Sequence, residues 1–348
     1  MTQTSAPVAL FPGQGSQHVG MGKDLYENFP IAREVFEECS DALHVDLKKL
    51  CFEGPETDLT LTENTQPCLL TASVAAYRVA HSELGFKPSA VAGHSLGEYS
   101  ALVAAGAFPL SSAARWVRER GIAMQRAVPA GEGSMAAIMG LEEEAILRLC
   151  SKATEATKQK RASGESSSVV EAIVQPANFN APGQIVIAGS SDAIREAVLL
   201  VQSGEFAGGK AIPLQVSAPF HCKLMAPARE RMAELFLKAQ PFERPRVLTA
   251  PYVPNRTARL TQESGVVFDL LVEQVDHPVL WQQSVKALLE SDVSSVGVEF
   301  GPGKVLAGLV KRISRSADRK FDVVSLGDSA GLKALEAMGP ALSAGKDH

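Results

Sequence analysis

Cysteine is scarce in this sequence. Five cysteines occur among 348 residues, an odd number, and no two of them have the Cys-x-x-Cys spacing. Disulfide frameworks and zinc sites depend on paired or clustered cysteines, so both are disfavoured. We therefore expect free thiols, no metal site and a reducing compartment, the cytoplasm.

Basic residues are not in excess either. Lysine and arginine together number 34 against 39 acidic residues, and the net charge is −5. Nucleic-acid-binding proteins usually carry a strong basic excess, so this balance argues against nucleic acid as a partner. The 45% of hydrophobic and 21% of charged residues are typical of a soluble globular protein.

Long apolar runs are absent as well. The longest uncharged and mostly apolar stretch, at 101–110, contains Pro109 and is shorter than the roughly 20 residues that span a membrane as a helix. Residues 1–8 have neither the basic nor the apolar segment of a signal peptide. The sequence therefore predicts a protein that does not enter a membrane.

What the sequence does contain is an alternation of short apolar runs and helical spacing. Residues 8–11 and 90–92 are typical of buried strands, and residues 30–50, 68–84 and 96–107 have helical spacing. This alternation predicts the α/β class, with a parallel sheet covered by helices on both faces. Later elements are expected as helices at 223–239, 266–275 and 281–290 and strands at 247–253 and 296–300.

The middle of the chain follows a different order. Its expected strands lie at 134–141, 169–175, 184–188 and 210–216, and its expected helices at 142–157 and 191–202. This β-α-β-β-α-β order is ferredoxin-like and predicts a small inserted subdomain. We place the insert at 132–205, the large subdomain at 1–131 and 206–348, a flexible polar loop at 157–168 and a fraying tail beyond Gly339.

Ser95 is the leading candidate for a nucleophile. It is central in Gly-His-Ser-Leu-Gly at 93–97, directly after a predicted strand and directly before a predicted helix. A sharp strand-to-helix turn exposes the serine oxygen, and flanking glycines let the neighbouring backbone approach without Cβ clashes. The first N–H of the helix, that of Leu96, is free to hold the anion that develops on an attacked carbonyl. The motif favours acyl chemistry over the alternative, a glycine-rich turn whose serine caps a helix.

A serine nucleophile needs a base, and seven histidines compete for that role. His221 is a candidate because it follows a predicted strand and a Ser-Ala-Pro-Phe turn, although it could merely close that connection. His94 adjoins Ser95, but consecutive residues at a turn point in different directions. No Asp or Glu between 95 and 221 stands out as the orienting acid. A Ser–His pair oriented by a backbone carbonyl or an amide side chain stays open.

Seven segments, in order along the chain, resemble one family. They are Phe-Pro-Gly-Gln-Gly-Ser-Gln at 11–17, Thr-Gln-Pro at 65–67, Gly-His-Ser-Leu-Gly-Glu-Tyr-Ser-Ala at 93–101, Arg-Gly and Met-Gln within 120–125, Asn-Phe-Asn-Ala-Pro-Gly-Gln at 178–184, Pro-Phe-His-Cys at 219–222 and Gly-Pro-Gly-Lys-Val-Leu at 301–306. With them the chain resembles the malonyl-CoA:acyl-carrier-protein transacylases from about residue 8 to 328. The resemblance implies an α/β-hydrolase-like large subdomain with a parallel sheet and an inserted ferredoxin-like small subdomain.

The same resemblance implies a reaction. A malonyl group would pass from malonyl-CoA to Ser95, and from there to the phosphopantetheine thiol of acyl carrier protein, in fatty-acid biosynthesis. His221 would serve as general base and acid. The enzyme would be a monomer and would need no cofactor of its own.

The resemblance also implies roles for four further residues. The backbone N–H groups of Gln14 and Leu96 would form the oxyanion hole, and the backbone carbonyl of Gln274 would orient the histidine. Arg120 would bind the free malonyl carboxylate, a role that suits the planar fork of donors in a guanidinium. Phe220, where some relatives carry serine, resembles malonyl-selective rather than methylmalonyl-selective enzymes.

Two other activities stay open. A discrete acyltransferase that serves a polyketide synthase would share every catalytic residue. A serine thioesterase or hydrolase would share the turn at Ser95, but a hydrolase of neutral esters has no need of a buried arginine at 120. Finally, basic residues late in the chain suggest a docking surface for an acidic carrier protein: Lys304, Lys311, Arg312, Arg315, Arg319 and Lys320.

Overall fold

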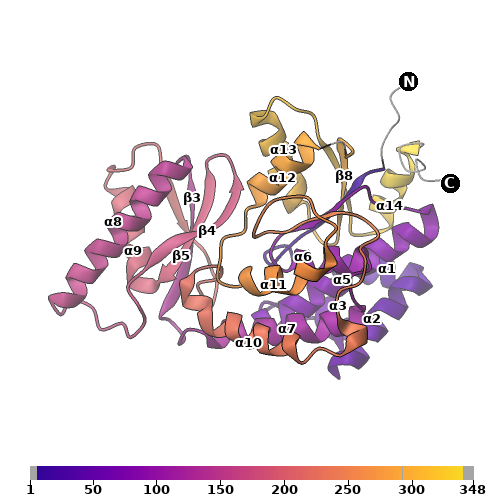
Figure 1. Cartoon of the computed structure of the whole chain (residues 1–348), viewed down its shortest axis with the longest axis horizontal. Coiled ribbons are helices and arrows are strands. Elements are labelled where there is room, and N and C mark those ends of the chain that lie inside the picture. Colours follow the sequence, from indigo (N-terminus) through magenta and orange to yellow (C-terminus); the bar gives the residue numbers. More distant parts are fainter. Residues whose placement is uncertain (1–5, 292, 340–348) are drawn as a thin grey trace.

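A five-stranded parallel sheet organises the larger part of the molecule (Figure 1). The computed structural model describes residues 6–291 and 293–339. Across this sheet the strands are β7 (Tyr252–Val253), β2 (Val91–Gly93), β1 (Val8–Phe11), β8 (Val296–Phe300) and β9 (Asp322–Leu326). The predicted α/β class is thereby confirmed.

Helices cover both faces of the parallel sheet. As a result, alternate residues of its central strand, β1, belong to two different cores. Ala9 and Phe11 share one core with apolar residues of α2 (Pro30–Leu43), α5 (Thr62–Leu84) and α7 (Leu110–Arg126). Val8 and Leu10 share the other with residues of α12 (Trp281–Glu290) and α13 (Val305–Ser316). A parallel strand buried on both faces needs a continuous apolar run, which Val-Ala-Leu-Phe provides.

Shorter elements complete the large subdomain. Its other helices are α1 (Lys23–Asn28), α3 (Leu47–Phe52), α4 (Glu56–Leu59), α6 (Gly97–Ala104), α10 (Ala226–Leu237), α11 (Val267–Glu273) and α14 (Ser329–Glu336), with 3-10 turns at Lys223–Met225, Pro241–Glu243 and Ser264–Val266. The paired strands β1 and β2 end together, with Phe11 opposite Gly93. The loops that follow them, which carry Gln14 and Ser95, therefore begin at the same edge of the sheet.

A second, antiparallel sheet forms the small subdomain, at the left of Figure 1. Its strands are β4 (Val174–Ala181), β5 (Gln184–Ser190), β3 (Gly133–Met139) and β6 (Lys210–Pro213), in that order, and α8 (Glu143–Ala162) and α9 (Ser191–Gln202) pack on them. The chain order is the predicted β-α-β-β-α-β. Backbone hydrogen bonds of 2.9 Å join this sheet to the large subdomain, from Phe179 to Val279 and from Val279 to Ala177.

The structure corrects the first part of the flexible loop expected at 157–168, because residues 157–162 are helical, whereas 163–168 form no helix or strand. Helix α8 continues to Ala162, and Thr157 is buried on it. The guanidinium of Arg161 contacts the carboxylate of Asp192 on α9 with two N–O distances of 2.8 Å. Polar composition suggested disorder, but these polar side chains bond to a neighbouring helix.

Other boundaries also differ from the expectation. Strand β4 begins at Val174 rather than at 169, and the strand expected at 247–253 is limited to Tyr252–Val253. Because β6 pairs with β3, the antiparallel sheet extends past residue 205, where we placed the end of the insert. The tail beyond Gly339 lies outside the described residues. No described helix is both long and apolar enough to cross a membrane.

Candidate active site

Ser95 follows β2 on a tight turn that two glycines make possible. Its backbone φ is 53°, in the left-handed region that residues with a Cβ rarely adopt. A Cβ on Gly93 would lie 1.9 Å from the carbonyl oxygen of Gly97, and a Cβ on Gly97 would lie 2.1 Å from that of Phe11. The glycines therefore let β1, β2 and α6 meet at this point, as the motif predicts.

His221 contacts Ser95 across 126 residues of sequence. Its Nε2 lies 2.7 Å from the Ser95 Oγ, and its Nδ1 lies 2.8 Å from the backbone carbonyl oxygen of Gln274. Because a carbonyl only accepts hydrogen bonds, Nδ1 carries the proton and Nε2 accepts from the serine hydroxyl. A backbone carbonyl thus occupies the place of the orienting acid that the sequence does not provide.

The environment of His221 keeps its ring neutral. Burial first, and then the positive charge of Arg120, lower its pKa to about 3, although the bond to the Gln274 carbonyl partly opposes this. A neutral imidazole is the form that accepts a proton from a nucleophile. The ring is therefore available as a base throughout the neutral pH range.

Arg120 projects from α7 into the same site and is 1% exposed. Its guanidinium donates to the side-chain oxygens of Gln66 at 2.9 Å, Gln274 at 2.7 Å and Ser95 at 3.1 Å. Its Nε has no hydrogen-bond partner among the described residues, and its guanidinium forms no direct ion pair with a described carboxylate, although the charge of Glu98 acts on it through space. Burial lowers its pKa, but arginine stays charged in proteins.

A buried cation without a paired anion is costly, so this arrangement fits a ligand that brings a carboxylate. The space beside it is a cavity of about 110 Å³. Its lining includes the polar residues Ser95, His221 and Arg120. It also includes the apolar residues Met124, Met135, Leu214, Val216 and Phe220. A short acyl group with a terminal anion matches both the size and the two kinds of lining.

Gln14 and Leu96 are the residues predicted to form the oxyanion hole. Leu96 directly follows Ser95, and Gln14 lines the cavity from the loop after β1. Within residues 6–291 and 293–339, neither backbone N–H donates to another backbone or side-chain group. Both donors are thus free for a ligand, and their role stays a prediction.

The structure adds three residues to which the sequence assigned no role. The side-chain oxygen of Gln66 accepts a hydrogen bond from Arg120. Glu98 accepts from the backbone of Asn255 and the side chain of Gln274, and Asn255 accepts from the Ser95 N–H. A charged residue within an otherwise apolar predicted helix was a visible signal for Glu98. Nothing in the sequence around Asn255 distinguishes it from a turn residue.

Known proteins are similar to this chain over nearly its whole length. The acyl transferase domain family matches residues 8–331. The malonyl CoA-acyl carrier protein transacylase of Escherichia coli (strain K12) is 45% identical over 305 residues, which cover 87% of this chain and 91% of the relative. The chain belongs to the malonyl CoA-acyl carrier protein transacylase family. The Bacillus subtilis (strain 168) member is 44% identical over 306 residues, covering 88% and 90%.

Solved structures of family members have the same two-subdomain fold. One is a type II PKS acyl-carrier protein in complex with its malonyl-transacylase. It has a TM-score of 0.84 and 40% identity, and the match covers 97% of this chain and 99% of the other. Members of this family are acyltransferases, so the predicted class of activity is confirmed. In this transacylase the predicted residues Ser95, His221, Arg120 and Gln274 lie in one site.

Proposed function

We propose that this transacylase moves a malonyl group from malonyl-CoA to the phosphopantetheine thiol of acyl carrier protein, through a malonyl-Ser95 intermediate in a ping-pong reaction. One observation carries the proposal. The Ser95 Oγ is within hydrogen-bond distance of both a neutral base, His221, and a buried cation that lacks an anion, Arg120. A base activates the nucleophile, and the cation selects acyl groups that end in a carboxylate.

In the first half-reaction the hydroxyl proton of Ser95 passes to Nε2 of His221 as Oγ attacks the thioester carbonyl carbon. The N–H groups of Leu96 and Gln14 donate to the oxyanion that forms. The tetrahedral intermediate collapses, the carbon–sulfur bond breaks, and the CoA sulfur takes the proton from His221. The product is the malonyl ester of Ser95 and free CoA.

The second half-reaction reverses the roles of the thiol and the serine. The carrier thiol gives its proton to His221 and attacks the ester carbonyl, and Ser95 Oγ leaves with that proton. Arg120 holds the malonyl carboxylate in both halves, so the acyl group stays in one position while the thiols exchange. Binding energy used in this way lowers the entropic cost of each attack.

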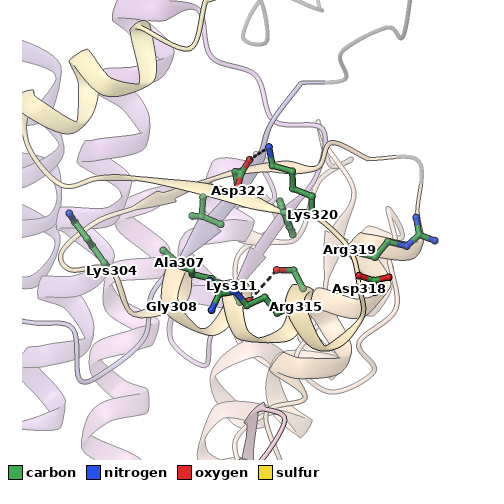
Figure 2. A pocket seen from close by; sticks show the side chains of 12 residues that line it. Lys304, Ala307, Gly308, Lys311, Arg315, Asp318, Arg319, Lys320 and Asp322 are labelled. Carbon is green, nitrogen blue, oxygen red and sulfur yellow. Dashed lines mark hydrogen bonds and ion pairs between the residues drawn. The ribbon is translucent and has the colours of Figure 1, made fainter.

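The carrier protein is proposed to dock on a basic groove beside α13 (Figure 2). The groove has a volume of about 840 Å³ and is lined by Lys304, Lys311, Arg315, Arg319 and Lys320. Lys320 is paired with Asp322 at 3.0 Å, which leaves the others available to an acidic partner. Arg312 does not line this groove; its guanidinium lies 3.4 Å from the side-chain oxygen of Gln184.

A role in fatty-acid biosynthesis is proposed on the strength of the relatives, whose names specify an acyl carrier protein. The discrete polyketide enzyme is the second candidate, because one structural neighbour is bound to a type II PKS carrier. The monomeric state and the cytoplasmic location stay predictions. Transfer rates to carriers of the two kinds would separate the candidates.

Intact-protein mass spectrometry tests the reaction. Incubation with malonyl-CoA should add one malonyl group to the wild-type enzyme and none to Ser95→Ala. Addition of holo carrier protein should remove the adduct and place it on the carrier. Release of free malonate at the same rate without a carrier would indicate a hydrolase instead. Equal labelling by acetyl-CoA would contradict the role of Arg120.

A further inference from the structure

Glu98 is a buried carboxyl that the reaction above does not use. It lies in the first turn of α6 and is 1% exposed. Its Oε1 has no hydrogen-bond partner among the described residues. Burial raises its pKa to about 7, although its two hydrogen-bond donors and the charge of Arg120 act in the opposite direction. Burying a carboxyl costs more free energy than burying an apolar side chain of the same size. The contacts of the other oxygen, Oε2, show what this carboxyl does.

That other oxygen, Oε2, accepts two hydrogen bonds from residues far away in the sequence. The backbone N–H of Asn255 donates to it at 3.1 Å, and the side-chain amide of Gln274 donates at 2.7 Å. Asn255 and Gln274 are both fully buried and follow β7 and α11. One carboxylate oxygen therefore ties two separate loops to the helix that begins at the nucleophile.

The first of these loops holds the backbone that leads from β2 into Ser95. The side-chain oxygen of Asn255 accepts from the Ser95 N–H at 2.6 Å, and its amide donates to the carbonyl of Gly93 at 2.6 Å. The amide of Gln274 adds a bond of 2.9 Å to the Ser95 carbonyl. A left-handed residue persists only where its surroundings determine it, and these bonds provide that support.

The second loop holds the base and the cation. The backbone carbonyl of Gln274 orients His221, and its side-chain oxygen accepts from Arg120 at 2.7 Å. The amide oxygen and amide nitrogen of Gln274 could exchange places in another rotamer. Because Oε2 of Glu98 accepts in this contact, it holds the amide nitrogen on its own side and turns the oxygen toward Arg120.

We propose that Glu98 is a positioning residue of this site, which through Asn255 and Gln274 fixes the Ser95 turn, the His221 ring and the Arg120 fork together. It touches neither the acyl group nor the reacting atoms. The proposal deepens the proposed function and rests on it only for the identity of the acyl group. The hydrogen-bond acceptor at residue 98, rather than its bulk, is the property that the site requires.

The experiment compares Glu98→Gln, which keeps an acceptor oxygen, with Glu98→Met, which has similar length and accepts no such bond. The readout is the second-order rate at which a fluorophosphonate probe labels Ser95, per folded molecule. This rate depends on the Ser95–His221 pair and on no malonyl group. We expect Glu98→Met to slow labelling about 100-fold, the cost of misplacing a catalytic group by about 1 Å, and Glu98→Gln to restore most of the rate.

Glu299→Met is the matched control. Glu299 is another fully buried carboxylate, but its oxygens accept from the backbone of Leu306 and Ala307 at the start of α13. Its loss should lower stability and leave the labelling rate within twofold of wild type. If Glu98→Met does not fold, Asn255→Ala replaces it in the comparison. This variant removes only the side-chain bonds of Asn255 to Gly93 and Ser95, and it should slow labelling while Glu299→Met does not.

Histidine-selective NMR gives a second readout, since the His221 ring resonances should shift in Glu98→Met and not in Glu299→Met. Equal labelling rates for Glu98→Met and wild type would overturn the proposal, as would equal slowing by Glu98→Met, Glu98→Gln and Glu299→Met. If malonyl-CoA failed to acylate the wild type while the probe rates kept the expected order, the proposed function would fail and the positioning role would stand.

Discussion

Ser95 and His221 both have left-handed backbones, with φ of 53° and 59°, and their side chains meet at 2.7 Å. Neither residue is a glycine, so each turn costs conformational energy that the surrounding contacts must offset. The two strained turns come from distant parts of the chain and aim their side chains at one point. The pair is thus formed before any substrate binds, which removes that ordering cost from the reaction.

Substitution of Gly97 tests how tightly the nucleophile turn is built. An alanine Cβ at 97 would lie 2.1 Å from the carbonyl oxygen of Phe11, so the backbone must move. A displacement of about 1 Å should lower malonyl transfer about 100-fold. Gly265→Ala is the control, because no atom lies within 4 Å of an added Cβ there. Steady-state kinetics with circular dichroism would measure both, and a Gly97→Ala enzyme as active as the control would refute the packing argument.

The charge of Arg120 should control the basicity of His221. Because burial and this charge lower the pKa of His221 to about 3, the ring should show no titration between pH 5 and pH 8 in histidine-selective NMR. Arg120→Gln removes the positive charge, so the pKa should rise. A malonyl carboxylate bound to Arg120 would act in the same direction and raise the basicity of the ring during the reaction. An unchanged His221 titration in Arg120→Gln would show that the two groups are not coupled.

The same pKa has a consequence for stability. The unfolded chain binds a proton at His221 below its ordinary pKa of 6.5, whereas the folded chain does so only near 3. The unfolded state therefore binds more protons in this window, and the free energy of unfolding should fall as the pH is lowered from 6.5 to 3. Urea unfolding of wild type and His221→Gln should show a smaller decrease for the variant.

Local patterns in the sequence were enough to predict the parts of this protein that depend on neighbouring residues. The run at Val8–Phe11 predicted a buried central strand, and the glycines around Ser95 predicted the turn. Contacts between distant residues were not predictable in this way. The extension of α8 depends on Arg161 and Asp192, which pair across two helices.

The same contrast between local patterns and distant contacts applies to the active site. Ser95 stands in a local motif and could be identified from the sequence, and the turn before His221 made it one candidate base. The choice of His221 as the base, of Arg120 as the cation and of Gln274 as the source of the orienting carbonyl needed a family resemblance. The side-chain roles of Gln274 and the contacts of Asn255 were missed altogether, because each joins loops more than 150 residues away in sequence. Only a structure brings such partners together.

Phe220 should exclude branched acyl groups from the cavity. Its ring lines the cavity beside His221 and is 8% exposed. Phe220→Ser would create room for an α-methyl group, and one methyl group in an apolar pocket is worth about 10-fold or more in specificity. We expect kcat/KM for methylmalonyl-CoA to rise by about that factor relative to malonyl-CoA. An unchanged ratio in competition assays would place the selectivity elsewhere.

Reversal of one charge in the basic groove tests the carrier-docking surface. Lys311 lines the groove and is exposed, with no ion pair within the described chain (Figure 2). Lys311→Glu should raise the KM for carrier protein several-fold at low salt, because it weakens long-range attraction and slows encounter. The effect should shrink as salt shortens the Debye length, and the KM for malonyl-CoA in the first half-reaction should not change.

Two controls make that result specific. Arg312→Glu makes the same charge change at the next residue in the sequence. Because the Arg312 side chain is directed toward Gln184, this variant should raise the KM for carrier protein less than Lys311→Glu does. Lys238 lies at the end of α10, whose buried residues belong to a different core from those of α13, so Lys238→Glu should leave the KM for carrier protein unchanged. If all three variants raised this KM equally, net charge alone would account for the effect. If none did, the carrier would dock on another surface.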